Sequence, residues 1–354
     1  MNLYILDEKL NTVAIYDYYK SIIWSNRYYK TGDFELQIPL VGDVKDKMRQ
    51  DYYIYRDVDY KDGIIERPKI IERVETVENA SENSLLVSGR DVTSLLERRV
   101  IYPTEILSGN YETCILNLIN NHAINPSDPK RVINTIAIDN TGRIDDTIDA
   151  QVTGDTLLKY IEDVSVDYKI GFRMDLDKNQ KKFIFKVYKG TKRTDNNPVI
   201  ISRDFNNLVK SNYVNDKQTY KNMAIVAGSG EGVDRKVVRL NDELSGLERR
   251  ELFVDAKDLS NTDSEGQTIP ESEYMEHLRQ RGSEKLSENK IDITNSCEAE
   301  TNGVFVYNKD YFLGDEIVCE GYMTFKERIV ETTESDTATG IKTELTFEEV
   351  EEDG

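Results

Sequence analysis

The aspartates between residues 139 and 149 are the first group of side chains in this sequence with a possible chemistry. Asp139, Asp145, Asp146 and Asp149 gather around Gly142. Two carboxylates that face each other across a cleft can hydrolyse a glycosidic bond, one of them acting as the acid. The spacing does not place such a pair across a cleft, and the same pattern is typical of a solvated loop. We favour the loop and keep a carbohydrate-active enzyme as an alternative.

A second acidic motif begins like a calcium loop and then departs from it. Asp175, Asp177 and Asn179 have the spacing of the first three ligands of such a loop. The sixth position needs a glycine and the twelfth a bidentate glutamate, and here they are Gln180 and Lys186. The motif therefore predicts a polar hairpin turn.

A glycine-rich run at 228–232 follows a predicted strand, as a phosphate-binding loop would. The residues after it, 233–238, alternate like a strand and do not open a helix. Without a helix amino terminus there is no cluster of oriented amide groups to hold a phosphate. The run predicts a hairpin tip.

Histidines and cysteines are too few and too scattered for a catalytic or metal-binding set. His122 falls at helical spacing after Cys114, which predicts a core or helix-cap histidine, and His277 lies in a charged helix. The three cysteines form no closely spaced pair and predict buried free thiols: Cys114, Cys297 and Cys319. We therefore predict that the protein is not an enzyme and has no catalytic, cofactor-binding or metal-binding residue.

Composition limits the classes of partner. The chain has 354 residues, with 66 acidic against 46 basic side chains and a formal net charge of −20, which argues against stable nucleic-acid binding because that requires a cationic surface. No apolar run reaches the length of a membrane span, so we expect no membrane insertion. The amino-terminal residues do not read as a signal peptide. We expect the protein to be cytoplasmic when it is made.

The segment from Ser21 to Pro39 organises the predicted fold. It holds the only tryptophan, Trp24, followed by an aromatic pair and a turn that contains Gly32. From Phe34 onward, apolar and polar residues alternate with a period of two, which predicts a strand with one buried face. We expect a core hairpin, with Trp24 and Phe34 buried. An exposed aromatic patch that binds a sugar or a partner is the alternative.

Three domains are predicted: residues 1–105, 106–200 and 201–354. Short β-rich segments fill 1–105 and predict a small antiparallel β-barrel, closed by a helix that Asp91 caps through its carboxylate. Residues 106–200 mix helices at 111–122 and 156–166 with a hairpin at 171–188 and form an α+β middle domain.

The third predicted domain, 201–354, returns to β-structure. It is interrupted by a polar loop and a helix at about 255–290, and it ends in an acidic tail from Glu348. The predicted fold class is therefore mainly β with an α+β insert: two tandem small antiparallel β-barrels with a helix-containing middle domain.

A repeated sequence pattern supports two barrels. The segment 71–76 (IERVET) precedes a polar loop and a strand, and the segment 327–332 (ERIVET) near the carboxyl end does the same. Similar glutamate- and threonine-rich hairpins can also arise by chance. We interpret the two segments as copies of one unit, separated by the middle domain.

Several segments together resemble a known family. Trp24 with its aromatic pair and the following GDFEL-x-x-P run is similar to the amino-terminal hub region of phage tail and baseplate proteins. These are the central hub of contractile tails and the hub region of siphophage tail-associated proteins. Three later segments also resemble the family: LVSGRD at 86–91 with the following leucines, YKN at 220–222, and YFLGD at 311–315.

The resemblance implies a virion structural protein that acts as a baseplate hub. Such a hub is a homotrimer whose six barrels form a pseudo-sixfold ring, a symmetry adaptor between the tail tube and a threefold spike or fibre. The implied partners are two further copies of the chain, a tail tube or distal tail protein, a spike or fibre protein and the tape measure protein. The implied location is a virion tail or a related contractile bacteriocin particle, the latter being a contractile injection system.

Two other functions remain open from the residues alone. A cell-surface polysaccharide-binding module would keep the aromatic residues around Trp24 exposed. A carbohydrate-active enzyme would use the Asp139–Asp149 cluster.

Overall fold

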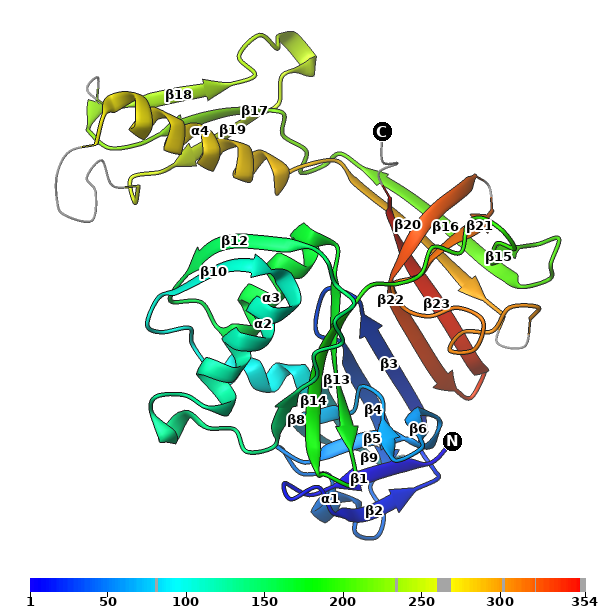
Figure 1. The fold of residues 1–354 in the computed structure, drawn as a ribbon. Coiled ribbons are helices and arrows are strands. Elements are labelled where there is room, and N and C mark those ends of the chain that lie inside the picture. The colour runs from blue at the N-terminus through cyan, green and yellow to red at the C-terminus, as the bar shows by residue number, and fades with distance from the viewer. Residues whose placement is uncertain (80–81, 233–234, 260–268, 301–302, 322, 351–354) are drawn as a thin grey trace. The chain divides into compact units, whose positions relative to one another are not determined.

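The computed structural model describes residues 1–79, 82–232, 235–259, 269–300, 303–321 and 323–350 (Figure 1). It is mainly β, with 44% strand and 19% helix, which confirms the predicted fold class of a β-rich protein with helices. Residue contacts divide the chain into two compact units. The first comprises Met1–Asn212 and Ser296–Gly354, and the second comprises Tyr213–Asn295.

The amino-terminal strands form as their alternation predicts. The first pair runs antiparallel, and the strands flanking the turn at Gly32 make a hairpin in which Trp24 stands opposite Phe34. The elements of this segment are β1 (Leu3–Leu6), β2 (Thr12–Tyr16), β3 (Ser21–Arg27), β4 (Asp33–Pro39) and the short helix α1 (Val44–Lys47).

A long hairpin follows, and it is longer than the sequence indicates. A polar loop is predicted at 78–83, but the strands continue to Asn79 and resume at Glu82, because glutamate, asparagine and serine suit a solvent-exposed ladder as well as a loop. The elements here are β5 (Tyr53–Arg56), η1 (Asp57–Asp59), β6 (Tyr60–Lys61), β7 (Ile64–Ile65), β8 (Lys69–Asn79), β9 (Glu82–Asp91) and η2 (Val92–Arg98).

The middle of the chain is α+β, as expected. Both predicted helices and the predicted hairpin are present, and Asn110 and Thr156 cap the helices through their side chains. The elements are β10 (Glu105–Asn110), α2 (Tyr111–Ile119), the π-helical turn η3 (Asn120–Ile124), η4 (Pro129–Arg131), β11 (Ile136–Ile138), β12 (Thr147–Val152), α3 (Leu157–Tyr168), β13 (Gly171–Asp177) and β14 (Lys182–Tyr188).

The carboxyl-terminal strands return to the large sheet of the first unit. The expected acidic tail from Glu348 begins later than predicted, because Glu348 and Glu349 still belong to the last strand; residues 351–354 lie outside the described part. The elements are β15 (Ile200–Ser202), β16 (Leu208–Asp216), β20 (Asp292–Ala299), β21 (Glu316–Glu320), β22 (Thr324–Thr337) and β23 (Gly340–Glu349).

The second unit packs one helix on a small sheet. Tyr274 and Leu278 of the helix are buried with Val226 and Val254 of the strands, as the apolar stripe of the helix predicts. Its elements are β17 (Met223–Ala227), β18 (Val237–Leu240), η6 (Gly246–Glu248), β19 (Glu251–Asp255) and α4 (Glu271–Ser287). Most of the predicted polar loop before α4, residues 260–268, lies outside the described residues.

The prediction of two β-barrels has to be corrected, because no closed barrel is found in the described part of the chain. Thirteen of the described strands form one sheet whose main path runs from β16 to β2, so two ends stay open. The short strand β15 adds to it through β21. The other strands of the first unit form a five-stranded sheet of order β11-β14-β13-β7-β6 and a two-stranded sheet of β10 and β12. The boundaries predicted at residues 105 and 200 remain predictions.

Two parts of the large sheet repeat the same arrangement. In chain order, β3, β4, β5, β8 and β9 take the sheet order β5-β8-β9-β4-β3, and β16, β20, β21, β22 and β23 take the order β21-β22-β23-β20-β16. The two sets therefore match strand for strand. This identity of order does not depend on any similarity of residues.

The two long hairpins also share one register. In each, three residue pairs are followed by a bulge and then by seven pairs: the bulge lies between Ile71 and Arg73 in β8 and between Ile329 and Glu331 in β22. Ile71 thus corresponds to Ile329 and Asn79 to Thr337. The identical VET sequences at 74–76 and 330–332 lie two residues out of this register. The sequence repeat therefore identifies the correct pair of hairpins, but its alignment is shifted by two residues.

The Trp24 hairpin belongs to the core of the first unit. Trp24 and Phe34 are 1% and 2% exposed, their ring centroids lie 5.6 Å apart, and both belong to a cluster with Leu3, Ile54 and Val87. This confirms the core interpretation. It also contradicts the alternative of an exposed aromatic patch around Trp24.

We expect Trp24→Ala or Phe34→Ala to lower the free energy of unfolding by about 3–5 kcal/mol, because each leaves a large cavity in the core. Ile23→Ala, on the exposed face of the same strand, is the matched control and should change it by less than about 0.5 kcal/mol. Denaturant unfolding followed by circular dichroism measures all three. Equal effects at Trp24 and Ile23 would contradict the assignment of faces.

Candidate interaction surface

A buried lysine stands at the junction of the Trp24 hairpin and the β8–β9 hairpin. The Lys69 side chain is fully buried and its ammonium group forms an ion pair with Asp91. Its other acceptors are the Ser25 carbonyl at 2.7 Å and the Asn26 side-chain oxygen at 3.0 Å. Burial lowers the pKa of Lys69, while the Asp91 carboxylate opposes that shift. Three acceptors match the three N–H donors of the ammonium group.

The role predicted for Asp91 is wrong in one respect. Asp91 precedes a helical segment, as expected, but η2 is a 3-10 helix and the Asp91 side chain does not cap it. Its carboxylate instead binds Lys69 and accepts a hydrogen bond from the Gly32 N–H at 2.9 Å. A full charge buried nearby attracts the carboxylate more strongly than the partial charge of a short helix does.

Gly32 must be a glycine because the backbone approaches this ion pair closely. A β-carbon at residue 32 would lie 2.2 Å from the Ser25 carbonyl oxygen and 2.8–2.9 Å from the Asp91 and Lys69 side chains. No rotamer change relieves the contact with a backbone oxygen. The turn of the Trp24 hairpin therefore rests directly on the charged pair.

A second buried cation joins the two copies of the repeat. Arg56 on β5 is 3% exposed and pairs with Asp59 and with Glu334 of β22, both at 2.8 Å. Its guanidinium carbon lies 4.8 Å from the centre of the Trp24 ring. Burial disfavours the charged form of Arg56, but its two carboxylate partners raise the pKa of Arg56 above its ordinary value. The ion pair and the cation–π contact together tie the first copy to the second.

Backbone pairing makes the same connection. The far half of β22 pairs with β3 in antiparallel fashion, from Glu331 opposite Arg27 to Asp336 opposite Ile22. The Tyr28 N–H donates to the Val330 carbonyl at 2.9 Å, and Arg27 forms an ion pair with Glu331 at 2.8 Å. The second copy thus continues the sheet of the first without a break.

The middle elements contact the same junction. Glu162 of α3 accepts a hydrogen bond from the Thr31 N–H at 2.8 Å, and Arg67 donates to the Tyr188 hydroxyl at 2.6 Å and to the Arg27 carbonyl at 3.3 Å. Elements from the whole length of the first unit therefore converge on the turn of the Trp24 hairpin.

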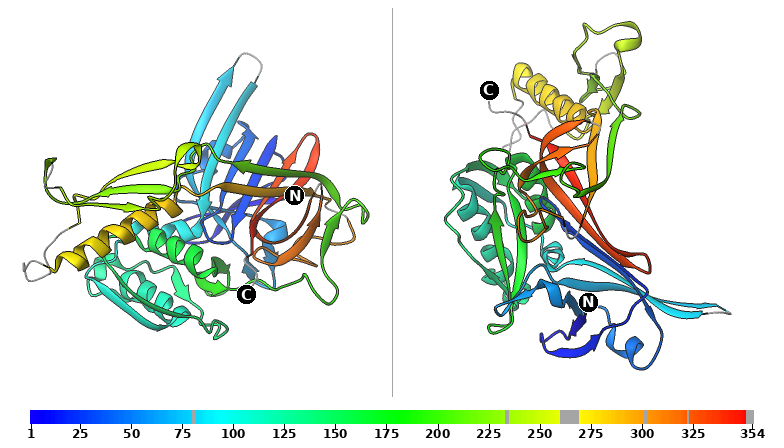
Figure 2. Two further views of the ribbon diagram at one scale, coloured as in Figure 1. Left: turned by 90° about the horizontal axis from the view of Figure 1, so that it is seen from above. Right: turned by 90° about the vertical axis from the view of Figure 1, so that its right-hand side faces the viewer.

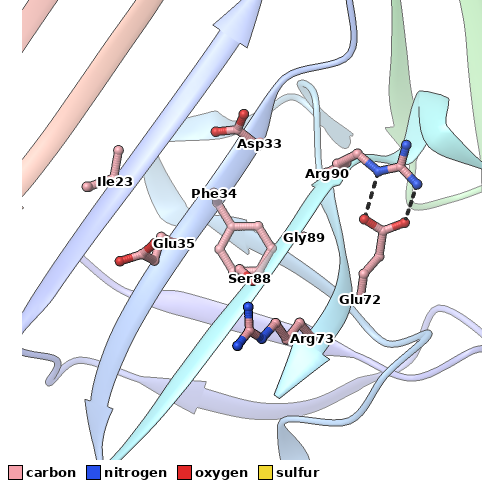
Figure 3. Close-up of a pocket in the computed structure, with 9 residues that line it drawn as sticks. All are labelled: Ile23, Asp33, Phe34, Glu35, Glu72, Arg73, Ser88, Gly89 and Arg90. Carbon is pink, nitrogen blue, oxygen red and sulfur yellow. Dashed lines mark hydrogen bonds and ion pairs between the residues drawn. The ribbon is translucent and has the colours of Figure 1, made fainter. Parts of the chain in front are cut away.

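A shallow depression of about 410 Å³ lies on the face of β4, β9 and β8 (Figure 3). Arg90 and Glu72 make a two-pronged ion pair across it, with both N–O distances 2.8 Å. Arg73, Asp33 and Glu35 add charge to the same lining. The depression is open and carries several charged side chains, so it fits a protein surface better than an enclosed small molecule.

The aspartates around Gly142 lie at the surface, and one of them forms an ion pair with a lysine. Asp145 and Asp149 are exposed, and Asp146 forms an ion pair with Lys189 at 2.6 Å. A buried residue that the sequence does not single out, Glu112, holds the loop by accepting hydrogen bonds from the Thr141 and Gly142 amides. Asp139, Asp145 and Asp146 lie outside helices and strands, as the loop interpretation predicts, whereas Asp149 lies on strand β12 opposite Ser108.

The Asp175 and Asp177 motif is a hairpin turn, as predicted. Asp177 accepts hydrogen bonds from the Asn179 and Gln180 amides at 2.8 and 3.0 Å. Asp175 is buried and forms ion pairs with Lys186 at 2.6 Å and Arg173 at 3.1 Å. Lys186, which fails as a calcium ligand, is therefore the charge partner of Asp175.

The glycine-rich run at 228–232 is a strand-to-strand connection between β17 and β18, as predicted. Gly228 lies against Tyr274 and Leu278 of α4, and the Ser229 N–H donates to the Tyr274 hydroxyl at 2.8 Å. These contacts give the run a packing role within the second unit.

His122 and the cysteines are also placed as expected. His122 is 2% exposed and its Nε2 lies 3.1 Å from Glu105; burial lowers the pKa of His122, against the pull of the Glu105 carboxylate. All three cysteines are free and buried, whereas His277 is exposed on α4. In the described part of the chain, no three acidic, histidine or cysteine side chains gather as a metal site would require.

None of the helices in the described residues has the length and apolar character needed to span a membrane.

The sequence interpretation does not identify the buried charges at the junction of the two hairpins. Lys69 and Asp91 are 22 positions apart. One signal could have paired them: Lys69 precedes one apolar strand segment and Asp91 follows another, so antiparallel pairing of the two segments brings the two charges together.

A family model described as Siphovirus ReqiPepy6 Gp37-like protein matches residues 2–347. The tail protein from Neisseria meningitidis MC58 is similar in structure, with 12% identity, coverage of 98% of this chain and 96% of that one, and a TM-score of 0.55. The 43 kDa tail protein of prophage MuSo2 from Shewanella oneidensis has 10% identity, coverage of 99% and 98%, and a TM-score of 0.53. At these identities the likeness concerns the fold. No curated protein matches the sequence significantly.

We expect Lys69→Met to lower the free energy of unfolding by about 3–5 kcal/mol, because it leaves the Asp91 charge buried without its main partner. Lys159→Met is the matched control, since Lys159 makes an exposed ion pair with Asp163 on α3 and should cost less than about 1 kcal/mol. Denaturant unfolding measures both, and a Lys69→Met variant as stable as the control would contradict this role.

Proposed function

The chain belongs to the family of Siphovirus ReqiPepy6 Gp37-like proteins, and from this premise we propose that it is a structural protein of a phage tail. The two tail proteins of similar fold support the proposal. The buried charged side chains also support it, because they pair with one another and hold backbone segments together, which is a structural role.

We propose further that the protein is the hub of the tail. In this role three copies form a ring that joins the tail tube, or a distal tail protein, to a threefold spike or fibre, and the tape measure protein ends at the ring. The repeated five-strand arrangement is the observation that carries this proposal. A chain with two copies of one unit presents six similar units in a trimer, and six units can match a sixfold tube while three chains match a threefold spike.

The location in a virion tail follows from the same premise. Membership in a siphovirus family favours a phage tail over a contractile bacteriocin particle. A polysaccharide-binding module loses its support because Trp24 is buried. A carbohydrate-active enzyme is not favoured, because Asp145 and Asp149 are exposed and Asp146 is paired with Lys189.

We expect the protein to assemble as a trimer at high concentration or with its tube partner. Light scattering should give three times the mass of the chain, and negative-stain electron microscopy should show rings with an open centre. Rings with another number of copies, or single copies within intact tail particles, would contradict the hub.

The acidic surplus gives a second expectation. With 66 acidic and 46 basic residues, a conduit for the genome should repel duplex DNA, because an adhesive wall would slow its passage. The purified protein should not retard duplex DNA in a gel at moderate salt. Retention that weakens steeply as salt rises would reveal a cationic patch and would argue for a protein that handles DNA.

A further inference from the structure

The long strand β8 has an edge that the described part of the chain leaves uncovered. One side of β8 pairs with β9 along its whole length, while β5 covers the other side only near its start. The last backbone contacts with the segment before β5 are made by Ile71, and the Glu72 carbonyl accepts from the Gln50 side chain at 3.0 Å. Figure 2 shows the far part of the β8–β9 hairpin, in cyan, extending beyond the strands around it.

The second copy of the repeat shows what covers this edge. In β22, the counterpart of β8, the edge before the bulge is covered by β21, and the edge after the bulge is covered by β3. The residues that pair with β3 are Glu331–Asp336, and the shared register makes Arg73–Glu78 their counterparts in β8. The first copy therefore has the bulge and the ladder without the covering strand.

The repeat also identifies the strand that is missing. The strand that covers β22 is β3, the end strand of its own five-strand set, and the end strand of the other set is β16. Among the described residues, β16 has one neighbour, β20, so its second edge is also open. Within one chain the two sets are joined by β3 and β22, which leaves β16 and β8 as the corresponding pair that no single chain joins.

We propose that β16 of one copy pairs with the far edge of β8 in a second copy of this chain, antiparallel as β3 pairs with β22. The inference rests on the proposed ring and names the joint between its chains. Three joints within chains and three between chains then alternate around a trimer. One continuous sheet runs through all six units.

The exposed side chains of both strands fit such a joint. Val74 and Val77 of β8 are half-buried and Val209 of β16 is 48% exposed, so pairing would cover apolar surface on both sides. Glu75 of β8 is exposed and so is Lys210 of β16, which gives opposite charges to the two edges. A long open ladder left uncovered would instead favour irregular aggregation.

The alternation of the ladder selects a position for the test. Ile71 exchanges hydrogen bonds with the segment before β5, so its partner Gly89 turns its own polar groups toward β4. One residue further, Ser88 faces Arg73 across the ladder. Alternation from that pair directs the N–H of Thr76 away from β9 and toward the open edge.

Thr76→Pro tests the proposal because proline removes the N–H that β16 of the second copy would use, while the β8–β9 ladder keeps its hydrogen bonds. Thr76→Val keeps the N–H and is the matched control. We expect the concentration at half-assembly, measured by light scattering, to rise at least tenfold for Thr76→Pro and to stay within twofold for Thr76→Val. Both variants should retain the circular dichroism spectrum of the unaltered chain.

Hydrogen exchange gives a second measurement that does not rely on a variant. On assembly, the amides of Val74, Thr76 and Glu78 and those of Leu208–Asn212 should be protected together. Unchanged assembly of Thr76→Pro, or rings without this protection, would overturn the joint and leave the hub proposal standing. A chain that never self-associates would also overturn the joint, whereas the hub proposal is judged by the copies counted in tail particles.

Discussion

The ion pair between Lys69 and Asp91 fixes the relation of the two hairpins on which the first unit is built. Moving two charges out of water costs several kcal/mol for each ion, and the cost is offset only when every donor and acceptor finds a partner. Here the ammonium group has three acceptors and the second oxygen of Asp91 receives the Gly32 amide. Neither hairpin can shift against the other without leaving a buried charge unsatisfied.

The second copy of the repeat does not use the same device. The counterparts of Lys69 and Asp91 in the shared register are Glu327 and Glu349, two residues of like charge. The two copies thus share strand order and register while they differ in what stabilises them. Arg56 connects the two copies, because it is buried in the first copy and forms an ion pair with Glu334 of the second.

Local patterns in the sequence were sufficient for the Trp24 hairpin, the helices α2, α3 and α4 and the hairpin of β13 and β14, since each has a complete apolar period. They were insufficient for β10 and β20, which carry little apolar alternation. The strand β12 was missed although its residues alternate, because Asp149 belongs to the acidic cluster that was interpreted as a loop. Closed barrels were predicted because short strands alone do not reveal where a sheet ends. The buried charges could not be predicted, since Lys69, Arg56 and Asp91 resemble surface residues until the strands beside them are placed.

The position of the second unit within the repeat has a consequence for how such proteins diverge. It is inserted between β16 and β20, which correspond to β3 and β4, so it occupies the place that the short turn at Gly32 holds in the first copy. Because the cost of closing a loop grows only slowly with its length, a hairpin end of this kind tolerates a turn or a whole folded unit with little effect on the sheet. Evolution can therefore exchange units at this end of the second copy, while in the first copy the contact of Gly32 with the charged pair keeps the turn short.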